Sequence, residues 1–151
     1  MPGDVAHTRA MATVFSRIIA GELPGHLVWA DDDVVAFLSI APLTPGHTLV
    51  VPRQEIDLWT DAPPALQAAV FRAAAAVGVA VRTAFDAPRA GLVVAGFEVP
   101  HLHVHVFPAW SMRQFDFASA HPEPDAGRLA DAASRIRAAL RAAGRTEVTG
   151  D

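Results

Sequence analysis

Residues 99–108 alternate single apolar residues with three histidines, His101, His103 and His105, and carry a proline near each end. Alternation with a period of two in an apolar, β-branched context is typical of a half-buried strand. We therefore expect one strand over residues 99–108, with the three histidines projecting from one face. The intervening apolar side chains are expected to enter the core on the other face.

Other apolar stretches, bounded by turn and cap residues, predict the remaining elements. Three consecutive aspartates at 31–33 form a polar turn between two strand candidates. Helix starts are indicated by Thr13, by Asp61 followed by two prolines, and by Asp125. The predicted strands cover residues 26–30, 34–40, 47–51 and 91–95, and the predicted helices cover 13–20, about 61–85 and 125–144. This order predicts an α+β fold: a five-stranded, mainly antiparallel sheet with a short N-terminal helix, a long inserted helix and a C-terminal helix.

Composition narrows the class of protein. A chain of 151 residues is long enough for one domain with its own core, and the lack of cysteine excludes disulfides, thiolate metal sites and thiol catalysis. The net charge of -4 and the scattered arginines leave no broad basic surface, so we expect a small partner and no long nucleic acid. No apolar run reaches the roughly 18 residues of a spanning helix, and residues 1–12 lack the pattern of a secretory signal. We therefore expect no membrane partner and a cytoplasmic location.

Imidazole side chains suit chemistry at neutral pH because they can act as nucleophile, general base or donor to a phosphate. In a strand, neighbouring histidines of the trio would lie about 6.6 Å apart at the backbone, and the outer two about 13 Å apart. Two neighbours can share a metal ion, but the outer two cannot. A metal site that combines one of the trio with His47, His26 or His121 stays open as an alternative.

Residues 101–107 read His-Leu-His-Val-His-Val-Phe, which resembles the His-φ-His-φ-His-φ-φ signature, with φ apolar, of the histidine triad (HIT) family of nucleotide hydrolases and transferases. The stretches 13–24, 31–37 and 45–52 are also similar to the family in order and spacing. This resemblance divides the chain into a disordered leader (1–12), a HIT domain (13–110), a C-terminal extension with a helix (111–144) and a disordered tail (145–151).

The resemblance implies a role for each of the three histidines. His103 attacks the α-phosphorus of a nucleotide derivative and forms a transient nucleotidyl-histidine, which water then hydrolyses. His105 donates to a non-bridging phosphate oxygen, and His101 supports the orientation of the other two. The scheme needs no metal and no cofactor.

The resemblance also implies a nucleotide pocket with apolar walls. Backbone N–H groups of residues 96–99 are expected to face the phosphate, where Glu98 brings a carboxylate. Ser39 stands at the ribose edge, at a position where many members have an aspartate. The residues expected to bind the substrate are Val14, Phe15, Ile18, Phe37, Ser39, Ile40, Leu49, Glu98 and Val99.

Two further departures from the family pattern bear on the site. The connection before residue 101 lacks the asparagine and the glutamine that assist substrate binding in many members. Some branches carry a zinc-binding Cys-x-x-Cys before the first helix, and here the matching residues are Thr13 and Ser16. No structural zinc is expected at that position.

Together these features predict a hydrolase that cleaves the α-phosphate bond of purine nucleoside phosphoramidates or related nucleotide conjugates. The resemblance implies a homodimer, paired through the long helix and the adjoining strand, which would also cover a sheet edge. A nucleotidyl transferase or a dinucleoside polyphosphate hydrolase would use the same intermediate. A nucleotide-binding module with weak turnover is a further alternative, favoured by Ser39 and the missing asparagine.

Overall fold

The computed structural model describes residues 12–121 and 125–150. The predicted leader therefore lies outside the described residues, apart from Ala12. The described strands are β1 (Leu27–Ala30), β2 (Val34–Leu38), β3 (Thr48–Pro52), β4 (Arg89–Val93) and β5 (Val104–Ala109). The described α-helices are α2 (Val14–Ile19), α3 (Pro64–Phe85) and α4 (Ala126–Ala142). The predicted α+β architecture is confirmed.

One five-stranded sheet joins all these strands in the order β1-β2-β3-β5-β4, and every neighbouring pair is antiparallel. The polar turn at 31–33 joins β1 to β2, as predicted. In the register of the central strands, Phe37 lies beside Leu49, and Leu49 lies beside His105. Two predicted pocket residues and one predicted catalytic residue thus form a single row across the sheet.

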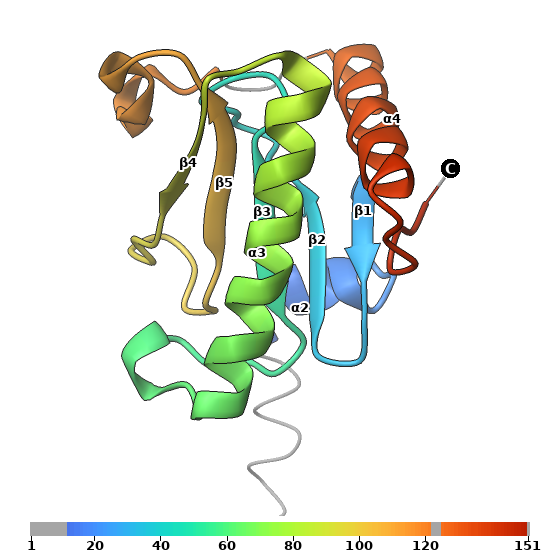
Figure 1. Cartoon of the computed structure of the whole chain (residues 1–151). Coiled ribbons are helices and arrows are strands. Elements are labelled where there is room, and N and C mark those ends of the chain that lie inside the picture. Colours follow the sequence, from blue (N-terminus) through green and yellow to red (C-terminus); the bar gives the residue numbers. More distant parts are fainter. Residues whose placement is uncertain (1–11, 122–124, 151) are drawn as a thin grey trace, which may run out of the picture.

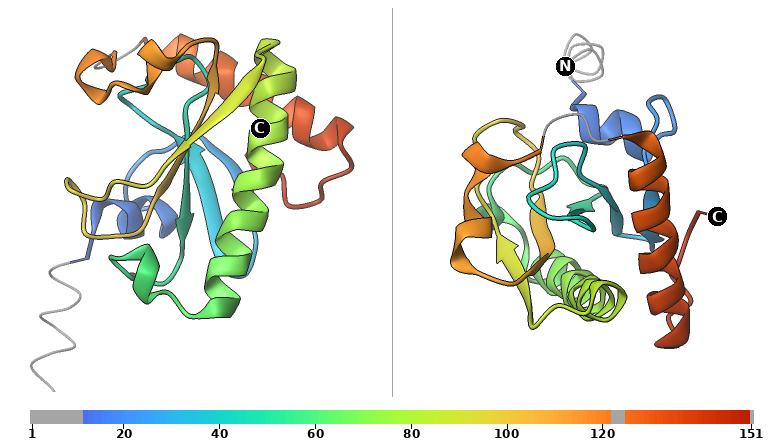
Figure 2. Two further views of the ribbon diagram at one scale, coloured as in Figure 1. Left: turned by 60° about the vertical axis from the view of Figure 1, so that its left-hand side comes forward. Right: turned by 90° about the horizontal axis from the view of Figure 1, so that it is seen from above.

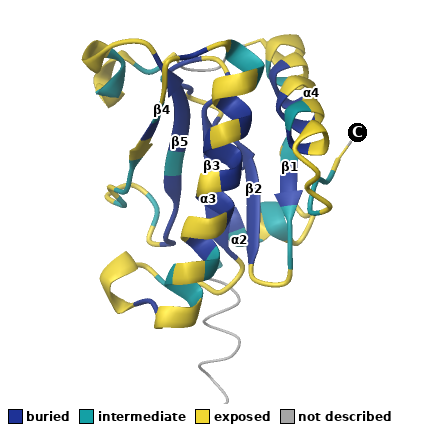
Figure 3. Ribbon diagram, viewed as in Figure 1, coloured by how far each residue is buried: buried dark blue, intermediate teal, exposed yellow. Residues whose placement is uncertain are grey.

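Helices α3 and α4 cover one face of the sheet and stand in front of the strands in Figure 1. The inner side of α3, which includes Val70, Val77 and Val81, packs in one core with Ile136 and Leu140 of α4. Figure 3 shows these inner surfaces buried and the outer ones exposed. Although α3 is long and apolar enough to span a membrane, half of its most apolar window is buried inside the protein, as in the core helix of a folded domain.

Helix α2 lies on the opposite face of the sheet, behind the strands in Figure 1 and across the sheet from α3 and α4 in Figure 2. Thr13 caps this helix by accepting the N–H of Ser16, which confirms the predicted start. The helix covers a second apolar cluster, which we call the α2 cluster. It consists of Phe15, Val35, Phe37, Leu49 and Val51, with Ile18, Ile19, Leu27, Ala30 and Val99 packed against it.

The histidine strand is shorter than the predicted span of 99–108. β5 begins at Val104, so it contains His105, whereas His101 and His103 precede it. The N–H of His101 donates to the Val99 carbonyl at 2.8 Å, a local turn that takes this part of the chain out of the sheet ladder. Residues 101–104 are nevertheless all buried.

The C-terminal tail is ordered, which corrects the predicted disorder from residue 145 onward for the described residues 145–150. The N–H of Thr149 donates to the Val28 carbonyl, so the tail lies along the outer edge of β1. Arg137 of α4, which is only 7% exposed, donates from its guanidinium to the carbonyls of Leu27 and Thr149. The tail thus covers a sheet edge that would otherwise present unpaired backbone groups.

Candidate active site

Four histidine side chains meet on the face of the sheet that α2 covers. The ring centroids of His103 and His105 are 4.9 Å apart, and those of His47 and His105 are 5.1 Å apart. The ring of Phe15 in α2 makes edge contacts with the rings of His103 and His101. The distances between ring centroids are 4.9 Å to His103 and 5.9 Å to His101. The predicted trio therefore shares one face. His47, which the sequence analysis considered only as a metal ligand, joins it.

His103 carries its ring proton on Nδ1. That nitrogen lies 2.7 Å from the His101 carbonyl oxygen, which can only accept, so His103 must donate. The other nitrogen, Nε2, then bears a lone pair, and it has no hydrogen-bond partner within the described residues. The side chain is 6% exposed. In its neutral form this fixed imidazole has a free Nε2 lone pair, which is suited to nucleophilic attack.

A chain of hydrogen bonds determines the tautomers of His47 and His105. The backbone N–H of Leu43 donates to Nδ1 of His47 at 2.9 Å, so that nitrogen is unprotonated. Nε2 of His47 therefore carries the proton and donates to Nδ1 of His105 at 3.0 Å. The remaining nitrogen of His105, Nε2, must then carry a proton. His105 presents an N–H donor beside the free nitrogen of His103.

Burial keeps this pair neutral. Burial first, and then the neighbouring His105 and His103, lower the pKa of His47 to about 3. Burial first, and then His103, lower the pKa of His105 to about 4. At neutral pH neither ring is charged, which agrees with the tautomers that the hydrogen bonds require.

His101 has no free ring nitrogen. Its Nε2–H donates to the Pro52 carbonyl at 2.8 Å, and its Nδ1 lies 2.7 Å from the hydroxyl oxygen of Thr13. The side chain is fully buried, and burial lowers its pKa. With both nitrogens engaged, His101 can orient its neighbours but cannot attack a substrate.

The predicted substrate-binding residues separate into two groups. Phe15, Ile18, Phe37, Leu49 and Val99 come together in the α2 cluster beside the histidines. The other group, Val14, Ser39, Ile40 and Glu98, lies outside this cluster. Val14 is 42% and Ile40 75% exposed, and Glu98 is also exposed.

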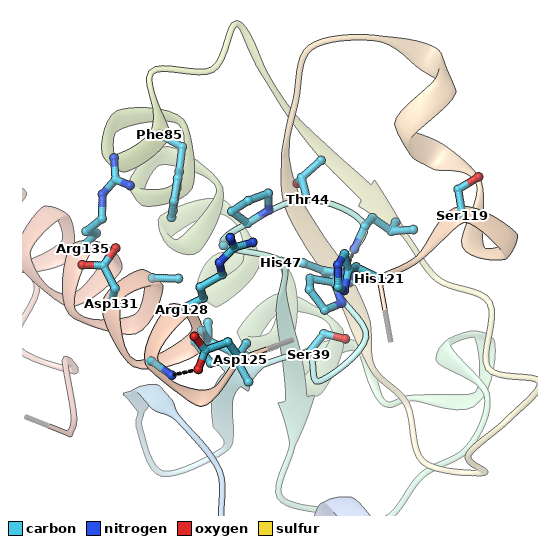
Figure 4. Close-up of a pocket in the computed structure, with 18 residues that line it drawn as sticks. Ser39, Thr44, His47, Phe85, Ser119, His121, Asp125, Arg128, Asp131 and Arg135 are labelled. Carbon is cyan, nitrogen blue, oxygen red and sulfur yellow. Dashed lines mark hydrogen bonds between the residues drawn. The ribbon is translucent and has the colours of Figure 1, made fainter. Parts of the chain in front are cut away.

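Ser39 lies at the end of β2, outside the α2 cluster. Its hydroxyl accepts the N–H of Ala41 at 3.1 Å, and the residue lines a cavity of about 890 Å³ between the 39–47 loop, the end of α3 and the start of α4. Figure 4 shows this cavity, with Ser39 and His47 on one side and Arg128 and Arg135 of α4 on the other. Of the four clustered histidines, His47 alone lines it. This cavity is therefore separate from the apolar wall beside His103.

The loop from β4 to His101 offers backbone donors. Within the described chain, the N–H groups of residues 96–99 donate to no protein group. Gly96 has a φ of +81°, a left-handed conformation that favours glycine and turns this loop towards the histidines that follow. Such unpaired N–H groups suit binding of a phosphate.

The C-terminal extension contributes an aromatic residue that the sequence analysis did not assign to the site. Phe117, in the short 3-10 helix η3 (Phe117–Ser119), places its ring 4.7 Å, between centroids, from His105 in an edge contact. Phe115 makes a similar contact with Phe107 at 4.8 Å. The segment therefore folds over the histidines of its own chain. An aromatic in an irregular segment has no periodicity from which this contact could be predicted.

Within the part of the chain that the structure describes, no group of three or more His, Cys, Asp or Glu side chains is placed to hold a metal ion. Both ring nitrogens of His47 and His101, and Nδ1 of His103 and His105, are engaged in hydrogen bonds. The metal alternative therefore lacks a ligand set around these histidines.

Comparison with known proteins places this site in a family. The family model of the HIT domain matches residues 20–112. The chain therefore belongs to the HIT family, whose members are generally nucleotide hydrolases or transferases.

Individual relatives agree with this assignment. The chain is 37% identical over 107 residues to an uncharacterized HIT-like protein of Saccharolobus solfataricus. The aligned region covers 65% of this chain and 74% of that protein. It is 30% identical over 100 residues to an adenylylsulfatase of Arabidopsis thaliana. Here the aligned region covers 63% of this chain and 51% of the relative. The crystal structure of a zinc-bound histidine triad family protein from Mycobacterium smegmatis is similar with a TM-score of 0.75 and 28% identity, over 89% of this chain and 96% of that one.

The residues present here do not fit a structural zinc. Thr13 and Ser16 stand at the positions matched to the Cys-x-x-Cys of some family branches, and neutral hydroxyls are not among the usual zinc ligands. Both hydroxyls are already engaged, Thr13 with His101 and Ser16 with the carboxylate of Glu55. Hydrogen bonds occupy the place that a metal would take.

Proposed function

We propose that this protein hydrolyses nucleotide conjugates at the α-phosphate, with His103 as the nucleophile. The observation that carries the proposal is the hydrogen bond from Nδ1 of His103 to the His101 carbonyl, because it leaves the Nε2 lone pair for attack. Membership of a family of nucleotide hydrolases and transferases supports it, as does the similarity to an adenylylsulfatase.

The reaction proceeds in two displacements. In the first, His103 Nε2 forms a bond to the α-phosphorus, and the bond to the leaving group breaks with its electron pair going to that group, which takes up one proton from solvent as it leaves. The ring keeps its Nδ1 proton and becomes positively charged, a charge that the His101 carbonyl stabilises. In the second, water forms a bond to phosphorus, and the bond between phosphorus and Nε2 of His103 breaks. This step releases a nucleoside monophosphate and one proton, and His103 returns to its neutral form.

His105 stabilises the charge that develops on the phosphate. Its Nε2–H donates to a non-bridging oxygen, and His47 keeps the proton on that nitrogen by occupying Nδ1. Because the donors are fixed before the substrate arrives, no reorganisation is needed during the reaction. The N–H groups of residues 96–99 supply further donors to the same phosphate.

The nucleoside binds against the α2 cluster. Phe15 contacts His103 directly, and it packs in one cluster with Ile18, Phe37, Leu49 and Val99. An apolar wall of this kind suits the flat face of a purine base. The hydroxyl of Ser39 accepts the N–H of Ala41, and its O–H remains available as a donor to a ribose hydroxyl.

Phosphoramidates and related conjugates are the substrate class that we assign. This class requires only the contacts that His103 and His105 make with the α-phosphate, and no further cationic partner for the leaving group.

The test measures AMP release from an AMP phosphoramidate and from an adenosine polyphosphate, with chelator present. We expect the wild type to release AMP, His103→Ala to release none, and His26→Ala, outside the cluster, to behave as wild type. Rapid acid-free quenching and mass spectrometry should find an AMP adduct on the peptide that contains His103. Tight binding without turnover would indicate a binding module, and activity lost on chelation would indicate a metalloenzyme.

We further propose that two copies pair along β4 and the outer side of α3. β4 lies at the sheet edge with β5 as its neighbour, and a groove of about 480 Å³ runs between β4 and α3. Large apolar side chains are exposed beside it, with Phe71 at 42%, Val79 at 58% and Leu92 at 45%. A second copy would cover both this apolar surface and the unpaired strand edge.

A further inference from the structure

Hydrogen bonds tie the N-terminus of α2 to the segment that follows β3. One carboxylate oxygen of Glu55 accepts the backbone N–H of Thr13 at 3.0 Å and also accepts the hydroxyl of Ser16. The hydroxyl oxygen of Thr13 in turn accepts the N–H of Ser16 at 3.1 Å. The position of the Thr13 hydroxyl is therefore fixed from two directions.

The proton of this hydroxyl has one good acceptor. Because the Pro52 carbonyl requires the His101 proton to be on Nε2, Nδ1 of His101 carries a lone pair. Thr13 Oγ1 lies 2.7 Å from that nitrogen and 3.4 Å from the hydroxyl oxygen of Ser16. The contact with His101 is the shorter and therefore the stronger hydrogen bond, so the Thr13 hydroxyl donates to Nδ1 of His101. This bond keeps His101 in the Nε2–H tautomer.

His101 also orients the proposed nucleophile, His103, through its backbone carbonyl. The backbone carbonyl of His101 accepts Nδ1–H of His103 at 2.7 Å, while the ring of His101 is anchored at both nitrogens. If the Thr13 hydroxyl were lost, Nδ1 of His101 would be left unpaired in a fully buried position. The ring would then be anchored only through Nε2, and the backbone of His101, including its carbonyl, would be held less firmly.

We propose that Thr13, held by Glu55, is a positioning residue for His103: its hydroxyl fixes the ring of His101 and thereby keeps the carbonyl of His101 aligned with Nδ1 of His103. The two hydrogen bonds of Thr13 join residues that are far apart in the chain. Glu55 is 42 residues from Thr13, and His101 is 88 residues from it. This proposal rests on the proposed role of His103.

The activity test compares Thr13→Val, which keeps the side-chain shape but removes the hydroxyl, with Thr13→Ser, which restores it. We expect Thr13→Val to lower kcat for AMP release by roughly tenfold, the size of one lost buried hydrogen bond, with KM changed less than twofold. Thr13→Ser should recover most of the lost kcat. Glu55→Gln and Ser16→Ala, which loosen Thr13 without removing it, should give intermediate values.

A second measurement does not depend on any substrate. Long-range ¹H–¹⁵N spectra of the histidine rings report which nitrogen carries the proton, and His103→Ala identifies the signals of that ring. We expect the wild type to show His101 protonated on Nε2 and His103 on Nδ1, and Thr13→Val to shift or broaden both sets of signals. If Thr13→Val keeps the wild-type ring signals of His103, Thr13 is only a helix cap and the proposal is wrong. If the signals change as expected but no variant releases AMP, the proposed hydrolysis is wrong while the positioning stands.

Discussion

Nε2 of His47 lies 3.0 Å from Nδ1 of His105, although the two residues are 58 positions apart in the chain. His47 comes from the end of the loop before β3, and Leu43 in the same loop fixes its tautomer. This contact determines where His105 carries its proton. It is therefore a condition for His105 to donate to the phosphate.

Loss of His47 should impair catalysis through His105. In His47→Phe, the N–H of Leu43 and Nδ1 of His105 both lose their partner, and His105 can then adopt the other tautomer. We expect kcat for AMP release to fall about tenfold or more. His47→Gln, whose side chain can both accept and donate, should retain more activity. Equal activity of the Phe variant and the wild type would show that His105 does not need this partner.

The stability of the fold should decrease as the pH drops below about 6.5, the pKa of an unperturbed imidazole. The pKa of His47 is lowered from 6.5 to about 3 in the folded protein, and that of His105 to about 4, whereas in the unfolded chain both return to about 6.5. Below pH 6.5 the unfolded state therefore binds more protons, so stability is complete above this pH and is lost below it. For His47 alone the loss between pH 6.5 and pH 5 is about 2 kcal/mol.

Urea unfolding at pH 5, 6 and 7 measures this dependence, because these values lie above the titration range of ordinary carboxylates. The urea midpoint should rise with pH up to about 6.5 and change little above it. His47→Gln should reduce the slope, since one of the two buried rings no longer titrates. A midpoint that is constant from pH 5 to 7 would contradict the proposed neutral pair.

The buried guanidinium of Arg137 should matter for stability rather than for catalysis. Arg137→Met removes the hydrogen bonds to the carbonyls of Leu27 and Thr149, and it releases the tail from β1. We expect the free energy of unfolding to fall by about 2 to 3 kcal/mol, typical of hydrogen bonds to a charged donor. Arg137→Lys should recover part of this, because an ammonium cannot reproduce the planar fork. An unchanged urea midpoint in Arg137→Met would mean that the tail does not contribute.

The proposed dimer can be disrupted at its apolar surface. Leu92→Arg on β4 or Val79→Asp on α3 would bury a charge in the interface, so either should convert the protein to a monomer in light-scattering measurements. Ala130→Arg, on the exposed side of α4, provides a control of similar size. A wild-type mass equal to that of one chain would rule out the pairing.

Local signals in the sequence were sufficient for the elements and for the shared face of the trio. The cap residues Thr13 and Asp125 begin helices as predicted, because an oxygen side chain that pairs a free helix N–H acts within three residues. Alternation placed His103 and His105 on the same side, because the backbone itself imposes a period of two. The match to the HIT signature then predicted His103 as the nucleophile, which is the role that we propose.

Tertiary structure alone decided how the histidines are held. The contacts of His47 with His105, of Thr13 with His101 and of Phe117 with the site join separate segments, and no local periodicity encodes them. The position of Ser39 outside the α2 cluster and the pairing of the tail with β1 likewise depend on loops and edges. Such contacts form where long-range packing brings donors and acceptors together, so the residue types were readable from the sequence but their partners were not.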